Sequence, residues 1–267
     1  MTECQGTRYS IDGLLTLASV SSWESFVRRM TYVGEWSVML VALMLLAYAL
    51  LQLNGWVSVP VVDDAQRGQI IPSRPTYDPQ LALTFNEADR DLWQKPEQVL
   101  DAVGDISGLR VADIGCGEGY FTTRLVERVG PLGMVFATDI QEEMLNQLHS
   151  RIPPEHAGRL VTVLAPPDQI GFSEVVDIIF MVQVLGEIQD QEAYLQQVKN
   201  VMHDASRLVF IDSRTVVDAT SGYSYPLNFK VLIESFERLG FELAPDGSHN
   251  FLPRQCFFVF RVRSNRE

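Results

Sequence analysis

The chain has 267 residues, with 34 Asp and Glu against 21 Lys and Arg, and a formal net charge of −13. This charge, with no basic run longer than Arg28-Arg29, argues against binding along a nucleic-acid backbone. Three distant cysteines indicate no disulfide framework, and four scattered histidines lack metal-ligand spacing, so we expect no metal site. The length suits one α/β domain of roughly 200 residues plus an extension.

The N-terminal part holds a mixed segment at 1–35 and then an apolar segment at 36–56. No charge occurs from Val38 to Leu51, and with its flanks the apolar stretch reaches about 18–20 residues. At about 1.5 Å per residue it can cross a hydrocarbon core of about 30 Å. Trp36 and Trp56 stand where interfacial aromatics belong. We therefore expect a single transmembrane helix at 36–56, with a buried core helix as the alternative.

A proline-rich stretch at 57–80 follows, which we interpret as an extended linker to a domain spanning 81–267. The domain opens with a short turn and then a helix that has Pro96 at its first position. In this opening, Arg90 could meet a carboxylate and Trp93 could cover a ring. A helix-capping surface segment is the alternative interpretation.

The central motif runs Asp113-Ile114-Gly115-Cys116-Gly117-Glu118-Gly119, between a predicted strand at 110–115 and a predicted helix at 120–129. A glycine loop there lets backbone approach a ligand closely, and the helix start directs free N–H groups at it. Dinucleotide folds use G-x-G-x-x-G, whereas the third glycine here comes one residue early. The loop therefore departs from the dinucleotide pattern, and a tight turn between strand and helix with no ligand is the alternative interpretation.

A second acid supports nucleoside binding. The next predicted strand, at 134–140, ends at Asp139, twenty positions after Gly119, with Ile140 beside it. A carboxylate at this strand end can accept hydrogen bonds from both ribose hydroxyls. Because dinucleotide folds share this device, Asp139 indicates a nucleoside more than it selects the cofactor.

The remaining pattern alternates helices and strands. The stretch at 177–183 is almost continuously apolar, which is typical of a parallel strand buried on both faces. We predict a Rossmann-like α/β fold, with a seven-stranded mostly parallel sheet and helices on both faces. The other predicted elements are helices at 141–148, 192–202 and 227–239, strands at 160–164 and 207–212, and a terminal hairpin at 241–243 and 251–260.

The acid-x-G-x-G-x-G loop resembles motif I of the class I S-adenosylmethionine-dependent methyltransferases. The stretches Arg90-Asp91-x-Trp93-Gln94-Lys95-Pro96 and Phe251-Leu252-Pro253-Arg254-Gln255 resemble a bacterial group of these enzymes, so the resemblance covers roughly 85–262. It implies S-adenosylmethionine as cofactor, with Asp113 suited to its ammonium group, directly or through water. The cofactor-binding residues that it implies are Asp113, Gly115, Cys116, Gly117, Gly119, Asp139, Ile140, Asp168 (near the adenine, or a plain turn acid) and Gln183.

Two stretches depart from this family pattern. Relatives often carry an asparagine and paired histidines after the fourth strand, where this chain has Gln183 and then Leu185-Gly186-Glu187. Glu187 is our candidate general base, with a solvent-exposed Glu as the alternative. A Pro-Gly-Gly turn is replaced by Asp204-Ala205-Ser206. These departures weaken any inference about the substrate.

The resulting hypothesis is a methyltransferase, in which the protein mainly aligns acceptor and methyl group. If the anchor is real, the acceptor is a small molecule, a lipid-like or quinone-like compound, or a membrane protein. The alternatives are a non-catalytic S-adenosylmethionine-binding scaffold and an NAD or nucleotide-sugar oxidoreductase. Arg28 and Arg29 would place the domain outside the cell, but cofactor supply favours a single-pass membrane protein with a cytoplasmic catalytic domain.

Overall fold

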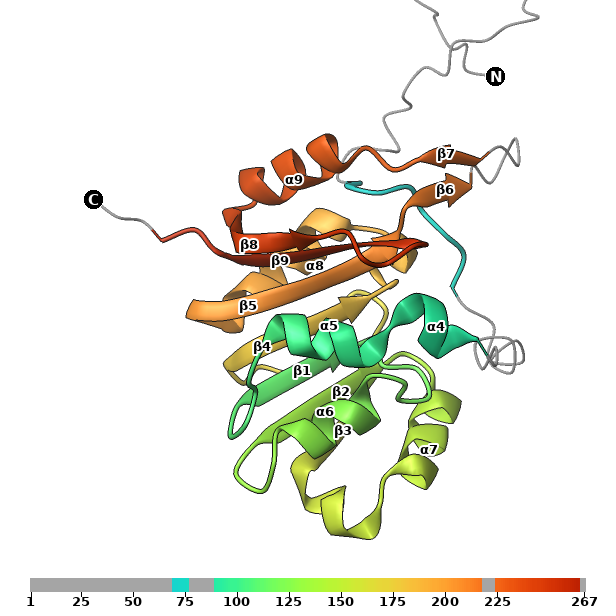
Figure 1. Ribbon diagram of the computed structural model, residues 1–267, viewed down its shortest axis with the longest axis vertical. Coiled ribbons are helices and arrows are strands. Elements are labelled where there is room, and N and C mark those ends of the chain that lie inside the picture. Colours follow the sequence, from blue (N-terminus) through green and yellow to red (C-terminus); the bar gives the residue numbers. More distant parts are fainter. Residues whose placement is uncertain (1–68, 77–88, 218–223, 265–267) are drawn as a thin grey trace, which may run out of the picture. The chain divides into compact units, whose positions relative to one another are not determined.

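The computed structural model describes residues 69–76, 89–217 and 224–264 (Figure 1). The predicted segments at 1–35 and 36–56 lie outside the described residues, as does most of the predicted linker. Among the helices that the structure does describe, none has the length and apolarity needed to cross a membrane.

A seven-stranded sheet forms the centre of the fold, in the order β3-β2-β1-β4-β5-β9-β8. Strands β1 to β5 are parallel, and β9 runs antiparallel to both β5 and β8. The predicted seven-stranded, mostly parallel sheet is therefore confirmed. The strands are β1 Arg110–Ile114, β2 Met134–Asp139, β3 Leu160–Leu164, β4 Val176–Val182, β5 Met202–Ser213, β8 Phe241–His249 and β9 Gln255–Val262.

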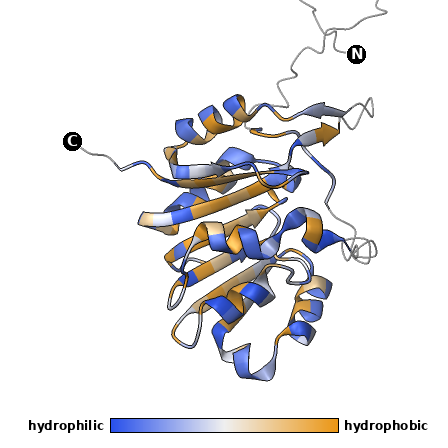
Figure 2. Ribbon diagram, viewed as in Figure 1, coloured by the Kyte–Doolittle hydropathy of each residue, from blue (hydrophilic) through white to orange (hydrophobic). Residues whose placement is uncertain are grey.

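Helices cover both faces of this sheet because its central strands are apolar on both sides. In β4, Ile178 and Phe180 pack in one core cluster, whereas Ile179 and Met181 pack in the other. Figure 2 shows the apolar strands at the centre of the fold and polar residues along the helices. The helices are α4 Arg90–Gln94, α5 Pro96–Val103, α6 Thr122–Arg128, α7 Glu142–Arg151, α8 Gln191–Asn200 and α9 Phe229–Arg238, with 3-10 turns η5 Pro154–Arg159 and η6 Leu185–Glu187.

Three features differ from the sequence-based expectation. Strand β5 begins at Met202, so the predicted turn at 204–206 is part of a bulged strand. The bulge forms because the Ser206 hydroxyl donates to the Val176 carbonyl (2.6 Å) and accepts the His203 N–H (2.9 Å). A small hairpin of β6 Thr215–Val217 and β7 Ser224–Pro226 was not predicted. Residues 69–76 do not form a free linker but are docked on the domain.

The aromatic cluster under α9 predicts where the fold is most sensitive to truncation. Phe236 is fully buried and stacks on Phe260 with ring centroids 4.3 Å apart. We expect Phe236→Ala to lower the free energy of unfolding by about 3–5 kcal/mol, because it leaves a cavity. Val231→Ala on the exposed side of the same helix is the control, with an expected change within about 0.5 kcal/mol. If Phe236→Ala and Val231→Ala lowered the thermal unfolding midpoint equally, the result would contradict a larger contribution of the buried Phe236 to stability.

Candidate cofactor-binding site

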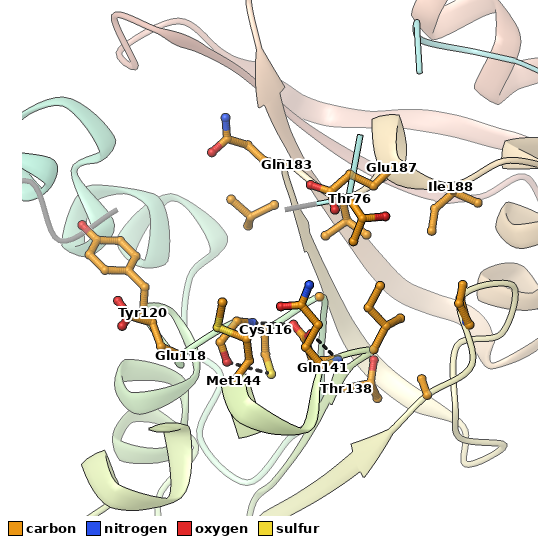
Figure 3. A pocket seen from close by; sticks show the side chains of 18 of the residues that line it. Thr76, Cys116, Glu118, Tyr120, Thr138, Gln141, Met144, Gln183, Glu187 and Ile188 are labelled. Carbon is orange, nitrogen blue, oxygen red and sulfur yellow. Dashed lines mark hydrogen bonds between the residues drawn. The ribbon is translucent and has the colours of Figure 1, made fainter. Parts of the chain in front are cut away.

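A cavity lies at the carboxyl ends of β1, β2 and β4 (Figure 3). The chain runs outward from β1 through β2 to β3 and then returns to β4 beside β1, so strand order reverses between β1 and β4. Ligands of open α/β sheets bind in the crevice outside such a reversal. The cavity volume is about 1090 Å³ including its open mouth.

The glycine loop after β1 forms the floor of this cavity. Gly117 lies in the left-handed region (φ 54°), lines the cavity, and would have open space around an added Cβ. Gly119 (φ 89°) is different, because a Cβ there would overlap the Leu148 side chain of α7. Gly119 is buried and does not line the cavity, so its role is to let the loop pack on α7. Gly115 and Cys116, both predicted at the site, do line it.

Asp139 joins the end of β2 to the glycine loop. One carboxylate oxygen accepts the Gly117 N–H at 2.8 Å and the other accepts the Gln141 N–H at 3.0 Å. The side chain lines the cavity, as does its neighbour Ile140. Burial raises the pKa of Asp139, while the hydrogen bonds from the backbone oppose that rise. The two bonds fix the orientation of the carboxylate before any ligand arrives.

Asp113 does not reach the cavity. Its side chain is buried and accepts the Thr122 hydroxyl at 2.6 Å, which joins the end of β1 to the start of α6. This geometry gives no direct contact with a ligand ammonium, which leaves the expected contact through water untested. Desolvation raises the pKa of this carboxyl to about 7. Asp113, the acid that begins the motif, therefore helps to hold the loop in place through its hydrogen bond with Thr122.

The segment after β4 forms the opposite wall. Gln183 and Glu187 both line the cavity, and Glu187 is half-buried rather than solvent-exposed. Gln183 has a left-handed backbone (φ 59°), which is uncommon for a residue other than glycine. Near β3, Ala165 and Pro167 line the cavity, but Asp168 is exposed and does not. The predicted contact of Asp168 with the adenine group is not supported by this placement.

Sequence reasoning identified three of the four charged residues that line the cavity and missed the fourth, Glu118. Glu118, inside the glycine loop, lines the cavity and pairs with Arg151 at 2.5 Å. Arg90 is the one Lys, Arg or His among the described lining residues, whereas three acids line it: Glu118, Asp139 and Glu187. Glu118 could have been found from its position between two motif glycines.

Arg90 is held in place by two neighbours. Its guanidinium carbon lies 3.6 Å from the centroid of the Tyr120 ring, and its Nε donates to Gln94 Oε1 at 2.7 Å. Desolvation lowers the pKa of Arg90. Trp93, expected to cover a ligand ring, does not line the cavity, and Arg254 lies 5.0 Å over its ring instead. Arg90 is therefore the residue of α4 that faces the site.

The raised pKa of Asp113 predicts a specific pH dependence. The folded carboxyl holds its proton up to about pH 7, whereas the unfolded one releases it near pH 4, so unfolding releases a proton between these values. Raising the pH from 4 to 7 should therefore lower stability through this group by up to about 4 kcal/mol. Asp113→Asn should remove that component, measured by denaturant unfolding at several pH values. If the unfolding free energy of Asp113→Asn fell with pH as steeply as that of the wild type, the result would contradict a raised pKa at Asp113.

The comparisons with known proteins agree with this geometry. Residues 105–234 match the family model described as a methyltransferase domain. The chain is 28% identical over 141 residues to a demethylmenaquinone methyltransferase of Lactococcus lactis, covering 51% of this chain and 54% of that protein. It is 29% identical over 143 residues to a ubiquinone/menaquinone biosynthesis C-methyltransferase UbiE of Vibrio vulnificus, with the same coverage. The chain thus spans about half the length of these curated relatives.

Solved structures with low sequence identity share the fold. A methyltransferase from Aquifex aeolicus that depends on S-adenosylmethionine (SAM) aligns with TM-score 0.61 and 22% identity, covering 70% of this chain and 100% of that chain. An O-methyltransferase of Brevibacillus brevis, in complex with S-adenosyl-L-homocysteine, aligns with TM-score 0.54 and 15% identity, covering 72% and 82%. Residues 105–234 are therefore similar in sequence to a methyltransferase domain, and the solved structures share the Rossmann-like fold of this chain.

Proposed function

We propose that this protein transfers a methyl group from S-adenosylmethionine to a small-molecule acceptor at the mouth of the cavity. The observation that carries the proposal is the combination of the Gly117 loop, the oriented Asp139 carboxylate and the charges on one cavity wall. S-adenosylmethionine carries an ammonium, a sulfonium and a carboxylate. Three acids and one arginine in the lining complement these groups.

The cofactor's nucleoside end fits the β2 side of the cavity. Asp139 would accept hydrogen bonds from the ribose hydroxyls, because both of its oxygens are already oriented by backbone N–H groups. The base would lie against Ile140, Ala165 and Pro167, which are apolar lining residues on that side. Because Gly117 has no side chain, the loop backbone can approach the ligand closely.

The amino-acid end fits the α4 side. Arg90 would bind the cofactor carboxylate, since a guanidinium matches the planar, two-oxygen geometry of a carboxylate. The stacked Tyr120 ring and the Gln94 amide reduce the freedom of the Arg90 side chain. Less side-chain entropy is then lost when the cofactor binds.

The acceptor would enter between the cofactor and the segment after β4. S-adenosylmethionine supplies a methyl group already activated by its positive sulfur, so the chain must mainly align the acceptor and exclude water. Glu187 would accept a proton where the acceptor must lose one. The relatives named for demethylmenaquinone and for ubiquinone or menaquinone biosynthesis support a quinone-like acceptor. A span at 36–56 would keep such an apolar acceptor near the domain.

The first test is calorimetric binding of S-adenosylhomocysteine to the full chain. We expect Asp139→Ala to weaken binding by roughly 100-fold or more, because two charge-assisted hydrogen bonds of about 1.5–3 kcal/mol each are lost. Asp168→Asn is the control and should bind like the wild type, since Asp168 does not line the cavity. Absence of S-adenosylhomocysteine binding by a folded wild-type chain would contradict the proposal. Binding without transfer to any acceptor in cell extract would favour the non-catalytic scaffold.

A second test isolates the role of Arg90. Arg90→Met should weaken binding of S-adenosylhomocysteine roughly tenfold but leave the affinity for its decarboxylated analogue, which keeps the ammonium, nearly unchanged. Arg124→Met is a matched control, because Arg124 also lies over the Tyr120 ring (4.7 Å) without lining the cavity. Equal losses for both ligands in Arg90→Met would show that Arg90 does not contact the carboxylate.

A further inference from the structure

The residues at 69–76, which we name the N-terminal strap, lie outside the matched family region and yet are built into the domain. Ile70 and Ile71 are buried in the main core cluster. Their backbone N–H groups both donate to Gln191 Oε1, at 2.7 and 2.9 Å, and Gln191 Nε2 donates to the Ile71 carbonyl at 2.8 Å. Because Gln191 is itself fully buried at the start of α8, the strap has one specific docking position.

Arg74 extends this docking to the edge of the sheet that carries the cavity. Its guanidinium pairs with the buried Asp212 carboxylate near the end of β5, at 2.5 and 3.3 Å. The same guanidinium donates to the Gln183 carbonyl after β4, at 2.7 Å. The Arg74 backbone N–H donates to the Gly186 carbonyl at 2.6 Å. One residue therefore joins β5, the end of β4 and the η6 turn.

The η6 turn is shaped to receive this side chain. A Cβ on Gly186 would lie 2.8 Å from Arg74 Nε and 3.0 Å from Arg74 Cζ, so a side chain at position 186 would require the guanidinium to shift. The backbone of Gly186 does not have a positive φ, so its conformation does not require glycine. What disfavours a side chain at this position is the close approach of Arg74.

The residues on either side of this contact line the cavity. Gln183 holds a left-handed backbone that costs free energy, and its N–H donates to the Ile211 carbonyl at 2.7 Å while its carbonyl accepts from Arg74. Figure 3 labels Gln183, Glu187 and Thr76, the last described residue of the strap, and all three line the cavity. The strap thus contributes one lining residue, Thr76, and is hydrogen-bonded directly to another, Gln183.

We propose that Arg74 is a positioning residue that holds Gln183 and the η6 turn at the cavity, so that the strap completes the acceptor side of the site. This proposal rests on the proposed function because it takes this cavity to be the cofactor site. The positioning itself is a property of the folded chain and can be measured without any acceptor.

The test is hydrogen–deuterium exchange on the full chain, together with thermal unfolding and S-adenosylhomocysteine binding. Arg74→Ala should speed exchange at 183–188 at least about tenfold and weaken binding by roughly fivefold to tenfold, because the strained backbone loses its partner. Arg128→Ala is the control, since Arg128 forms exposed ion pairs with Glu97 and Asp101 away from the cavity. Unchanged exchange at 183–188 in Arg74→Ala would overturn the proposal.

Arg74→Lys separates positioning from charge pairing. Lysine can still neutralise Asp212 but lacks the planar fork that reaches two acceptors. We therefore expect Arg74→Lys to restore most of the thermal midpoint while exchange at 183–188 stays fast. Full restoration of both by lysine would mean that only the ion pair matters. The variant Arg74→Ala/Asp212→Asn avoids leaving a buried charge unpaired, and it should show the same fast exchange in a stable chain.

A double-mutant cycle tests the contact from its other side. Gly186→Ala should displace the Arg74 guanidinium and reproduce the fast exchange, but it should add nothing in the Arg74→Ala background. Additive effects would contradict a shared contact. If the wild type fails to bind S-adenosylhomocysteine while the exchange results hold, the proposed function fails and the positioning by the strap stands.

Discussion

The Asp139 carboxylate is the interaction on which the site depends. By accepting one backbone N–H from Gly117 and one from Gln141, it ties the loop after β1 to the helix after β2. These elements come from neighbouring parallel strands, whose carboxyl ends meet at one edge of the sheet. Without the carboxylate, two backbone donors of the cavity floor would lose their partner. The same atoms that would bind a ribose therefore also hold the loop that receives the rest of the ligand.

The sequence predicted the parts of the fold that depend on local signals. Continuous apolarity at 177–183 predicted a strand buried on both faces, because this signal lies in the residues of the strand itself. The bulge in β5 was missed because it depends on the Ser206 hydroxyl meeting the Val176 carbonyl, thirty residues earlier. The residues at 204–206, taken by themselves, indicate only a turn.

For the candidate site, as for the fold, the sequence predicted the features that depend on local signals and missed those that depend on distant contacts. The motif residues Gly115, Cys116 and Gly117 and the acid Asp139 all line the cavity, because their spacing is tied to the strand–loop–helix unit. Their contact with a cofactor stays a prediction. Asp113 was assigned to the ligand from its position in the motif, but the direction of its side chain toward Thr122 is set by packing on α6. The strap was read as a linker because its prolines are visible in the sequence, whereas its partner Gln191 is 120 residues away.

The edge of the sheet that forms the site concentrates buried acids, in contrast to the apolar interior of the strands. Desolvation raises the pKa of Asp113, Asp139 and Asp212. Only Asp212 has a cation beside it, since Arg74 pairs with it from the strap. A ligand with a sulfonium and an ammonium would bring positive charge to the same edge and favour the ionised acids. Binding would then stabilise the fold by an amount that rises with the logarithm of ligand concentration. Cofactor recognition and the stability of this edge would be coupled most directly through Asp139, the one of these three acids that lines the cavity.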